Sequence, residues 1–200
     1  MATAERVLDI FEAFARLQKP LTLSQLSNAV GAPVSSCFSI VKTLEESGYL
    51  HCVSDRKEWY PTGRMAAHAR AIEKGEPLLA RFDPILNALR KETDETIILG
   101  QIASTGNSIL YLKVFESSQA IRYTSEIGAK KPIHSTAIGK AILSSMPEEQ
   151  RSRAARSLKF KGITDRTIAD AEDLLEDIRQ GLDRGYQMTR GENVVDVGAL

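Results

Sequence analysis

The sequence predicts an α+β protein of two units, a small helical unit followed by a larger unit of strands and helices. Two observations carry this prediction. Residues 4–50 place apolar side chains at helical spacing, with turn signals between the helical segments. From residue 96 onward, short strand-like runs separated by turn residues precede further helical segments. The length of 200 residues exceeds one typical domain and agrees with two units.

The stretch Thr22–Leu50 reads as two short helices joined by a turn. Its first residue and Gln25 have the spacing of a capping box, which marks a helix start. Gly31 suits the left-handed residue that ends such a helix, and Pro33 cannot continue it. A second helix is expected over residues 35–46, with an apolar face for packing and a polar face left open. This arrangement is a helix-turn-helix.

An amphipathic helix is expected before this motif and a strand hairpin after it. Residues 4–17 carry an apolar stripe that can pack on the next two helices. Residues 49–53 and 58–62 read as two strands, and the turn between them contains Arg56 and Lys57. Three helices followed by a hairpin make a winged helix, and the two adjacent cations suit contact with a phosphate backbone.

The rest of the chain divides into a linker and a second domain. We place the winged helix at residues 1–63, a linker helix at residues 64–76 and the second domain at residues 77–200. The linker is Ala-rich with little apolar stripe, so it suits either a spacer or a surface that pairs with another copy. In the second domain, strands are expected at 96–103 and 108–115, with a third over 120–127.

Composition excludes several classes of protein. Two cysteines are too few for a disulfide framework, and no Cys and His pair has metal-ligand spacing. No signal peptide or apolar run of membrane-spanning length is present, so we expect a cytoplasmic protein without cofactor or metal. The net charge is zero, and residues 1–63 carry six cationic against seven anionic side chains. Bulk electrostatics therefore gives no support to DNA binding, which would rest on local cations such as Lys42.

Six stretches follow one another in the order and spacing of a known family: RVLDIFEAF (6–14), PLTLSQLSNAVGAPVSS (20–36), TLEESGYL (43–50), PIHSTAIGKAIL (132–143), TIAD (167–170) and RGYQMTRGENVVDVGAL (184–200). In these stretches the whole chain resembles the IclR family of bacterial transcription regulators. The resemblance implies an N-terminal winged helix that binds DNA, a linker helix that helps to make a dimer, and a GAF-like effector domain that binds a small molecule, often an organic acid. The family continues with further strands and a final helix, so we expect the effector domain to be incomplete here.

The resemblance makes the helix over residues 35–46 the recognition helix. The common family pattern, roughly Lys-Ser-Thr-Val-His-Arg, is replaced by Val34-Ser35-Ser36-Cys37-Phe38-Ser39, so the usual cationic and imidazole side chains are absent. Phe38 could either pack in the core against the wing or touch a thymine methyl group. The expected DNA contacts are Thr22, Ser35, Ser36, Phe38, Ser39, Lys42, Thr43, Arg56 and Lys57.

The resemblance also implies where the effector binds. Backbone N–H groups at the helix start near Thr136 can hold a carboxylate. Asp196 stands where the family usually has a glycine, and Thr189 stands where some members are acidic. The expected effector contacts are Gly128, Thr136, Ala137, Ile138, Gly139 and Thr189.

Other polar residues have simpler interpretations. His134 is expected to be structural, Lys140 to lie on a solvated helix face, and Cys37 to be a small core residue. A hydrolase site made of His134, Ser135 and Lys140 would need a positioned base and an oxyanion site, so we expect no enzyme. We interpret the chain as an IclR-type regulator that controls a catabolic operon in response to a small organic or aromatic acid. It would bind double-stranded operator DNA as a homodimer or tetramer; the alternative is a winged-helix protein-interaction module with impaired DNA or effector binding.

Overall fold

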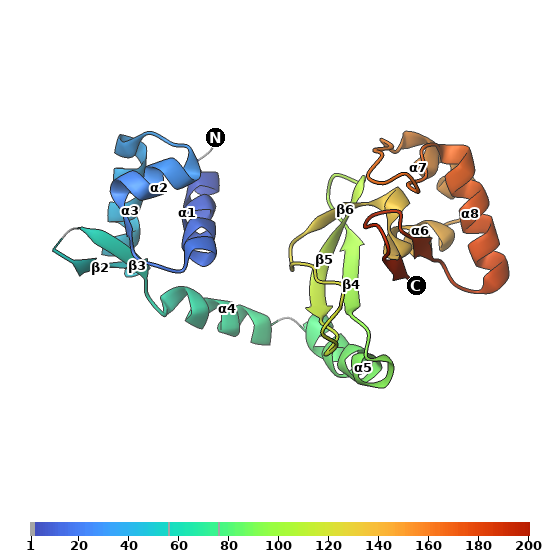
Figure 1. Ribbon diagram of the computed structural model, residues 1–200, viewed down its shortest axis with the longest axis horizontal. Coiled ribbons are helices and arrows are strands. Elements are labelled where there is room, and N and C mark those ends of the chain that lie inside the picture. The colour runs from blue at the N-terminus through green and yellow to red at the C-terminus, as the bar shows by residue number, and fades with distance from the viewer. Residues whose placement is uncertain (1–2, 56, 76) are drawn as a thin grey trace. The chain divides into compact units, whose positions relative to one another are not determined.

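The computed structural model describes residues 3–55, 57–75 and 77–200 (Figure 1). The chain divides into two compact units, Met1–Pro77 and Leu78–Leu200. Helices and sheets occur together, and the α+β prediction is confirmed. No helix within the described ranges combines the length and the apolar character needed to cross a membrane.

The first unit is a winged helix followed by one further helix (Figure 1). Its sheet is antiparallel with strand order β1-β3-β2. The short strand β1 was not expected from the sequence, and it pairs Leu21 with Trp59. The elements are α1 (Thr3–Leu17), β1 (Leu21–Thr22), α2 (Leu23–Val30), α3 (Val34–Glu46), β2 (Leu50–Ser54), β3 (Glu58–Pro61) and α4 (Arg64–Lys74).

Local signals in the sequence explain where α2 begins and ends. The Thr22 hydroxyl accepts a hydrogen bond from the Gln25 N–H at 3.3 Å, and Gln25 Oε1 accepts one from the Thr22 N–H at 2.9 Å. The capping box is therefore confirmed. Gly31 ends the helix at φ +61°, a left-handed conformation that favours glycine. The three helices then share one apolar core with β3, including Ile10, Leu26, Cys37, Val41 and Trp59.

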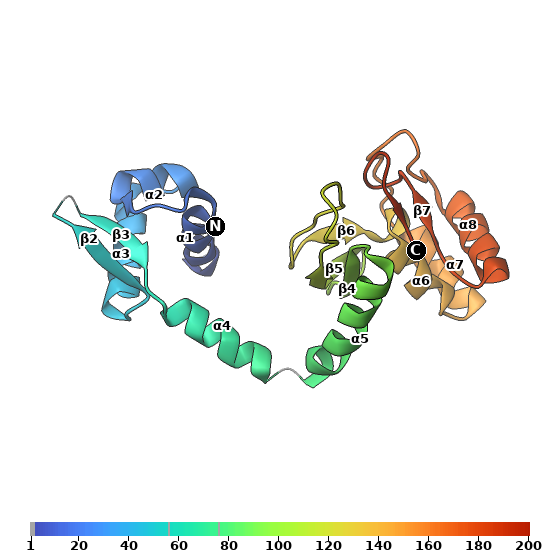
Figure 2. The same cartoon turned by 60° about the horizontal axis from the view of Figure 1, so that its bottom comes forward.

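The second unit combines a three-stranded sheet with several helices. The sheet is antiparallel with strand order β4-β5-β6, and Figure 2 shows α6, α7 and α8 close to one another beside it. Its core contains Ile109, Ile133, Leu143, Leu174 and Ile178. The elements are α5 (Pro77–Thr93), β4 (Ile97–Ile102), β5 (Ser108–Phe115), β6 (Lys130–Pro132), the 3-10 helix η1 (Ile133–Ser135), α6 (Ala137–Ser144), α7 (Glu148–Ser157), α8 (Ala171–Arg184), β7 (Thr189–Arg190) and β8 (Gly198–Ala199).

The third strand of this sheet is not the one expected. Residues 120–127 form a loop, and β6 occupies the edge instead, with Lys130 opposite Leu110. Side-chain hydrogen bonds tie this part of the chain to the residues before β4, where the Thr96 hydroxyl donates to the Tyr123 carbonyl at 2.8 Å. The Ser117 hydroxyl similarly donates to the Asp94 carbonyl at 2.6 Å.

Candidate functional site

The outward face of α3 carries most of the expected DNA contacts. Cys37 is buried, as predicted, and points into the core with Ile40 and Val41. Phe38 lies on the opposite face with 52 % of its surface exposed, so the core-packing interpretation of Phe38 is wrong. Exposed side chains on this face are Val34, Ser35, Phe38, Ser39, Lys42 and Thr43, and Ser36 is half-buried beside them.

Hydrogen bonds within α3 limit what its polar side chains can offer. The Ser39 hydroxyl donates to the Ser35 carbonyl at 3.3 Å, and the Thr43 hydroxyl donates to the Ser39 carbonyl at 2.9 Å. Lys42 lies 3.8 Å from the Glu46 carboxylate, one turn further along. Ser39 and Thr43 therefore present acceptor oxygens to a ligand, and the positive charge of Lys42 is partly balanced.

Two further expected DNA contacts, Thr22 and Lys57, lie outside α3. The Thr22 hydroxyl is engaged in the capping box at the start of α2. Lys57 is exposed in the turn between β2 and β3, in a left-handed conformation with φ +53°. Arg56 lies outside the described residues.

The second unit contains a cavity of about 650 Å³, a size typical of small-molecule sites. Residues from α5, β4 and β5 form one side, and the start of α6 and the segment from Met188 form the other. Most of the wall is apolar, as shown by Leu89, Ile97, Ile98, Ile138 and Val194. The cavity thus suits a ligand with an apolar body.

Four of the six expected effector contacts line this cavity: Thr136, Ala137, Ile138 and Thr189. The structure does not bring the other two to the wall. The Gly128 N–H donates to the Tyr111 carbonyl at 2.8 Å in the turn before β6, at φ +88°. Gly139 faces η1 so closely that a Cβ atom there would overlap the Ile133 carbonyl. Both glycines therefore serve the backbone rather than the cavity.

Polar groups collect where α6 begins. The Thr136 hydroxyl caps the helix by accepting from the Gly139 N–H at 3.1 Å. The N–H groups of Ala137 and Ile138 have no hydrogen-bond acceptor in the described part of the chain, and both residues line the cavity. These amides and the positive end of the helix can receive an anionic group.

Further polar groups surround the cavity. The Asn193 amide donates to the Ser135 hydroxyl at 2.9 Å, which joins the wall on one side to η1 on the other. Tyr111 and Tyr123 share a side-chain hydrogen bond, and burial with this contact raises the pKa of Tyr111. The tyrosines and Asn193 can therefore recognise oxygen atoms on a ligand.

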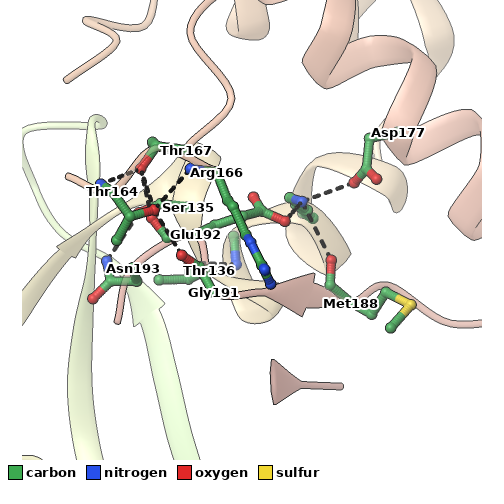
Figure 3. Close-up of polar contacts among 12 residues, drawn as sticks. Ser135, Thr136, Thr164, Arg166, Thr167, Asp177, Met188, Gly191, Glu192 and Asn193 are labelled. Atoms are coloured by element: carbon green, nitrogen blue, oxygen red, sulfur yellow. Dashed lines mark hydrogen bonds and ion pairs between the residues drawn. The ribbon is translucent and has the colours of Figure 1, made fainter. Parts of the chain in front are cut away.

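Lys140 was expected on a solvated face, and this expectation is wrong. Its side chain is 0 % exposed, and Nζ lies 2.8 Å from Asp177 Oδ2 and 2.8 Å from Glu192 Oε1. The ammonium also donates to the Met188 carbonyl at 3.2 Å (Figure 3). Burial raises the pKa of Glu192, although the Lys140 charge opposes this shift. The three charges join α6, α8 and the cavity wall.

The segment 188–193, which we call the wall segment, is held by side chains on several sides (Figure 3). The Thr164 hydroxyl donates to the Gly191 carbonyl at 2.6 Å, and the Thr167 hydroxyl donates to the Glu192 carbonyl at 2.7 Å. Together with the bonds from Lys140 and to Ser135, these bonds fix the wall segment, of which Thr189 and Arg190 form the short strand β7.

His134 has the structural role expected of it. The ring is buried and packs on Phe160 with centroids 4.9 Å apart. Its Nε2 lies 3.2 Å from the Lys161 carbonyl, and burial lowers the pKa of the imidazole from 6.5. Across the described residues, no group of three or more His, Cys, Asp or Glu side chains could hold a metal ion.

Comparison with known proteins agrees with this architecture. Residues 3–52 match the family described as the IclR helix-turn-helix domain, and residues 71–200 match the family described as the bacterial transcriptional regulator IclR C-terminal. The HTH-type transcriptional regulator KipR of Bacillus subtilis is 31 % identical over 183 residues, which span 88 % of this chain and 70 % of that protein.

Solved structures share the fold. The Thermotoga maritima IclR structure has a TM-score of 0.78 at 23 % identity, covering 96 % of this chain and 76 % of that one. An IclR homologue from Microbacterium hydrocarbonoxydans, solved in complex with 4-hydroxybenzoate, has a TM-score of 0.70 at 18 % identity, covering 98 % and 80 %. The relatives are regulators of transcription rather than enzymes, which agrees with the expectation for this chain. The chain belongs to the IclR family of bacterial transcriptional regulators.

Proposed function

We propose that this regulator controls a catabolic operon in response to a small organic or aromatic acid bound in the cavity of the second unit. The carrying observation is the pairing of an apolar cavity of about 650 Å³ with the unpartnered amides of Ala137 and Ile138 at its polar end. An acid would place its carboxylate on these amides and its body against Ile97 and Ile98. The homologue solved with 4-hydroxybenzoate supports an aromatic acid as one candidate.

The proposed partner of the first unit is double-stranded operator DNA. The α3 face would enter the major groove, as recognition helices do, and the wing with Lys57 would rest on the backbone. The expected contacts Ser35, Ser36, Phe38 and Ser39 share this face, and Lys42 and Thr43 continue it. The chain would act as a homodimer or tetramer, since α4 exposes 73 % of Ile72 on a helix suited to pairing.

Effector binding would change operator affinity through a difference in its affinity for two states of the protein. The wall segment is suited to this role, because it lines the cavity and is tied to α6 and α8 through Lys140. A ligand that moves this segment would have to rearrange those bonds.

The effector proposal is tested by thermal unfolding of the full chain with 4-hydroxybenzoate, benzoate and short aliphatic acids. A binder present at one hundred times its Kd stabilises the folded protein by about 2.7 kcal/mol, which raises Tm by roughly 5–10 °C. Ile98→Trp fills the cavity and should abolish the shift, whereas Ile127→Trp, on an exposed loop residue, should preserve it. Shifts that persist in Ile98→Trp would place the binding elsewhere.

The DNA proposal is tested by a gel shift with the DNA upstream of the regulator's own gene. We expect a complex at low salt whose affinity changes when the acid found in the thermal screen is added. Absence of any complex even at low salt would favour the alternative of a protein-interaction module.

A further inference from the structure

Two exposed apolar side chains lie in the first two turns of α3, the part of a recognition helix that contacts base edges. Val34 and Phe38 are four residues apart, so they lie on one face one turn from each other. Val34 is 49 % exposed and Phe38 is 52 % exposed. The N-terminal residues of a recognition helix are those that contact bases in the major groove.

The polar residues of the same face offer few hydrogen-bond donors for guanine. Guanine presents two acceptors, N7 and O6, and is commonly recognised by donors from Arg or Lys. The hydroxyl hydrogens of Ser39 and Thr43 are used within the helix, and Lys42 faces Glu46. Apart from the partly balanced Lys42 and the Ser35 hydroxyl, the face therefore offers acceptor oxygens and apolar carbon.

These properties match an A·T pair. Thymine carries a 5-methyl group in the major groove, and adenine presents its N6 amino group as a donor. We propose that Val34 and Phe38 determine operator specificity by contacting thymine 5-methyl groups, with the Ser39 oxygen available to accept from an adjacent adenine. This inference rests on the proposed binding of operator DNA and specifies which side chains of α3 contact the bases.

A protein partner fits these two side chains less well. Stable protein interfaces bury roughly 800 Å² on each partner, which is far more than two half-exposed side chains flanked by serines and Lys42 can supply. A methyl group needs only a small apolar surface at the correct position. The small apolar area of Val34 and Phe38 therefore favours a contact with a base.

The test begins with DNA sites selected from a random duplex library by the wild-type protein. The best site is then synthesised with deoxyuridine in place of each thymidine, which removes one methyl group and leaves base pairing unchanged. We expect the Kd to rise about fourfold for each methyl group that is contacted, in line with the transfer free energy of one methyl-sized group. Phe38→Ala should bind the thymidine site more weakly and show little further loss on deoxyuridine.

Two other variants control for folding and for general loss of apolar surface. Phe38→Leu keeps an apolar side chain on α3 and should keep part of the deoxyuridine effect. Leu8→Ala removes an exposed apolar side chain from α1 and should keep all of it. Thermal unfolding of each variant shows whether the first unit remains folded.

Several results would overturn the inference. Equal wild-type affinity for thymidine and deoxyuridine sites refutes methyl recognition while leaving DNA binding intact. Full discrimination retained by Phe38→Ala refutes the role of this residue. Reduced self-association of Phe38→Ala with an unchanged deoxyuridine effect would assign the apolar pair to an interface between copies. Failure to select any DNA at low salt would refute DNA binding itself, and the inference with it.

Discussion

Lys140 is held by oxygen atoms of three residues from two parts of the second unit. Asp177 belongs to α8, whereas Glu192 and the Met188 carbonyl belong to the wall segment. A fully buried ammonium is tolerated only because these groups compensate its charge. Removing it leaves the Asp177 and Glu192 carboxylates without the ammonium that both contact.

We therefore expect Lys140→Met to lower the free energy of unfolding of the second unit by about 3–5 kcal/mol. Urea unfolding of the full chain measures this loss. The matched control is Lys159→Met on an exposed residue, which should change stability by less than about 0.5 kcal/mol. The double variant Lys140→Met with Glu192→Gln should recover part of the loss, and no recovery would contradict the role of the charges.

His134 gives the stability of the second unit a predictable dependence on pH. Burial holds the pKa of its imidazole below 6.5, so the unfolded chain binds more protons than the folded chain between the two pKa values. The stabilisation from the neutral ring is complete above about pH 6.5 and declines as the pH falls through the folded-state pKa.

Urea unfolding at pH 7.5 and 5.5 should therefore show a larger loss of stability on acidification for the wild type than for His134→Gln, which cannot titrate. His51→Gln, on an exposed histidine of β2, should retain the wild-type difference. Identical acid sensitivity of the wild type and His134→Gln would show that other groups account for all of it.

Among the elements, α6 depends on a close approach that only glycine permits. A Cβ atom at Gly139 would overlap the Ile133 carbonyl of η1, and η1 supplies Ser135 to the cavity wall. Backbone cannot move away as a flexible side chain can, so α6 would have to shift.

We expect Gly139→Ala to destabilise the second unit by about 2 kcal/mol or more and to weaken binding of the acid found in the thermal screen. Gly162→Ala is the matched control, since a Cβ atom there would meet nothing within 4 Å. Thermal unfolding with and without ligand measures both effects. Equal stability of the two variants would show that η1 adapts.

Elements marked by local signals were predictable from the sequence. The capping box, Gly31 and the apolar stripe placed α2 and α3. The strand expected at 120–127 does not form, and the Tyr123 carbonyl in that segment accepts a hydrogen bond from Thr96, which is 27 residues away in the sequence. The actual edge strand β6, Lys-Lys-Pro, has no strand propensity of its own and forms through pairing with β5.

In the site, too, features with local sequence signals were predictable and features that depend on distant residues were not. The start of α6 was predictable from Thr136 and the helix that follows it, whereas the burial of Lys140 was not. Its partner Glu192 lies 52 residues further along the chain, so no local pattern reveals the ion pair. Likewise, only the backbone contacts of Gly128 and Gly139 reveal that these two residues do not line the cavity.

For the whole molecule, zero net charge predicts a weak salt dependence of DNA binding. If Lys42, Arg56 and Lys57 each neutralise one phosphate, log K should fall with log salt with a slope of about −3 per bound chain. Gel-shift titration between low and moderate salt measures this slope. A slope steeper than about −4 per chain would show that cations outside α3 and the wing bind DNA.

The apolar, weakly charged face of α3 also has a kinetic consequence. A protein without a strong positive field gains little electrostatic steering, so its association rate with DNA should lie near the 10⁵–10⁶ M⁻¹s⁻¹ of unsteered encounters. It would also spend little time sliding on non-specific DNA, since such sliding depends on phosphate contacts. Operator occupancy would then be set mainly by how long each complex lasts, and an effector that shortens this residence time would empty the operator without competing against rapid rebinding.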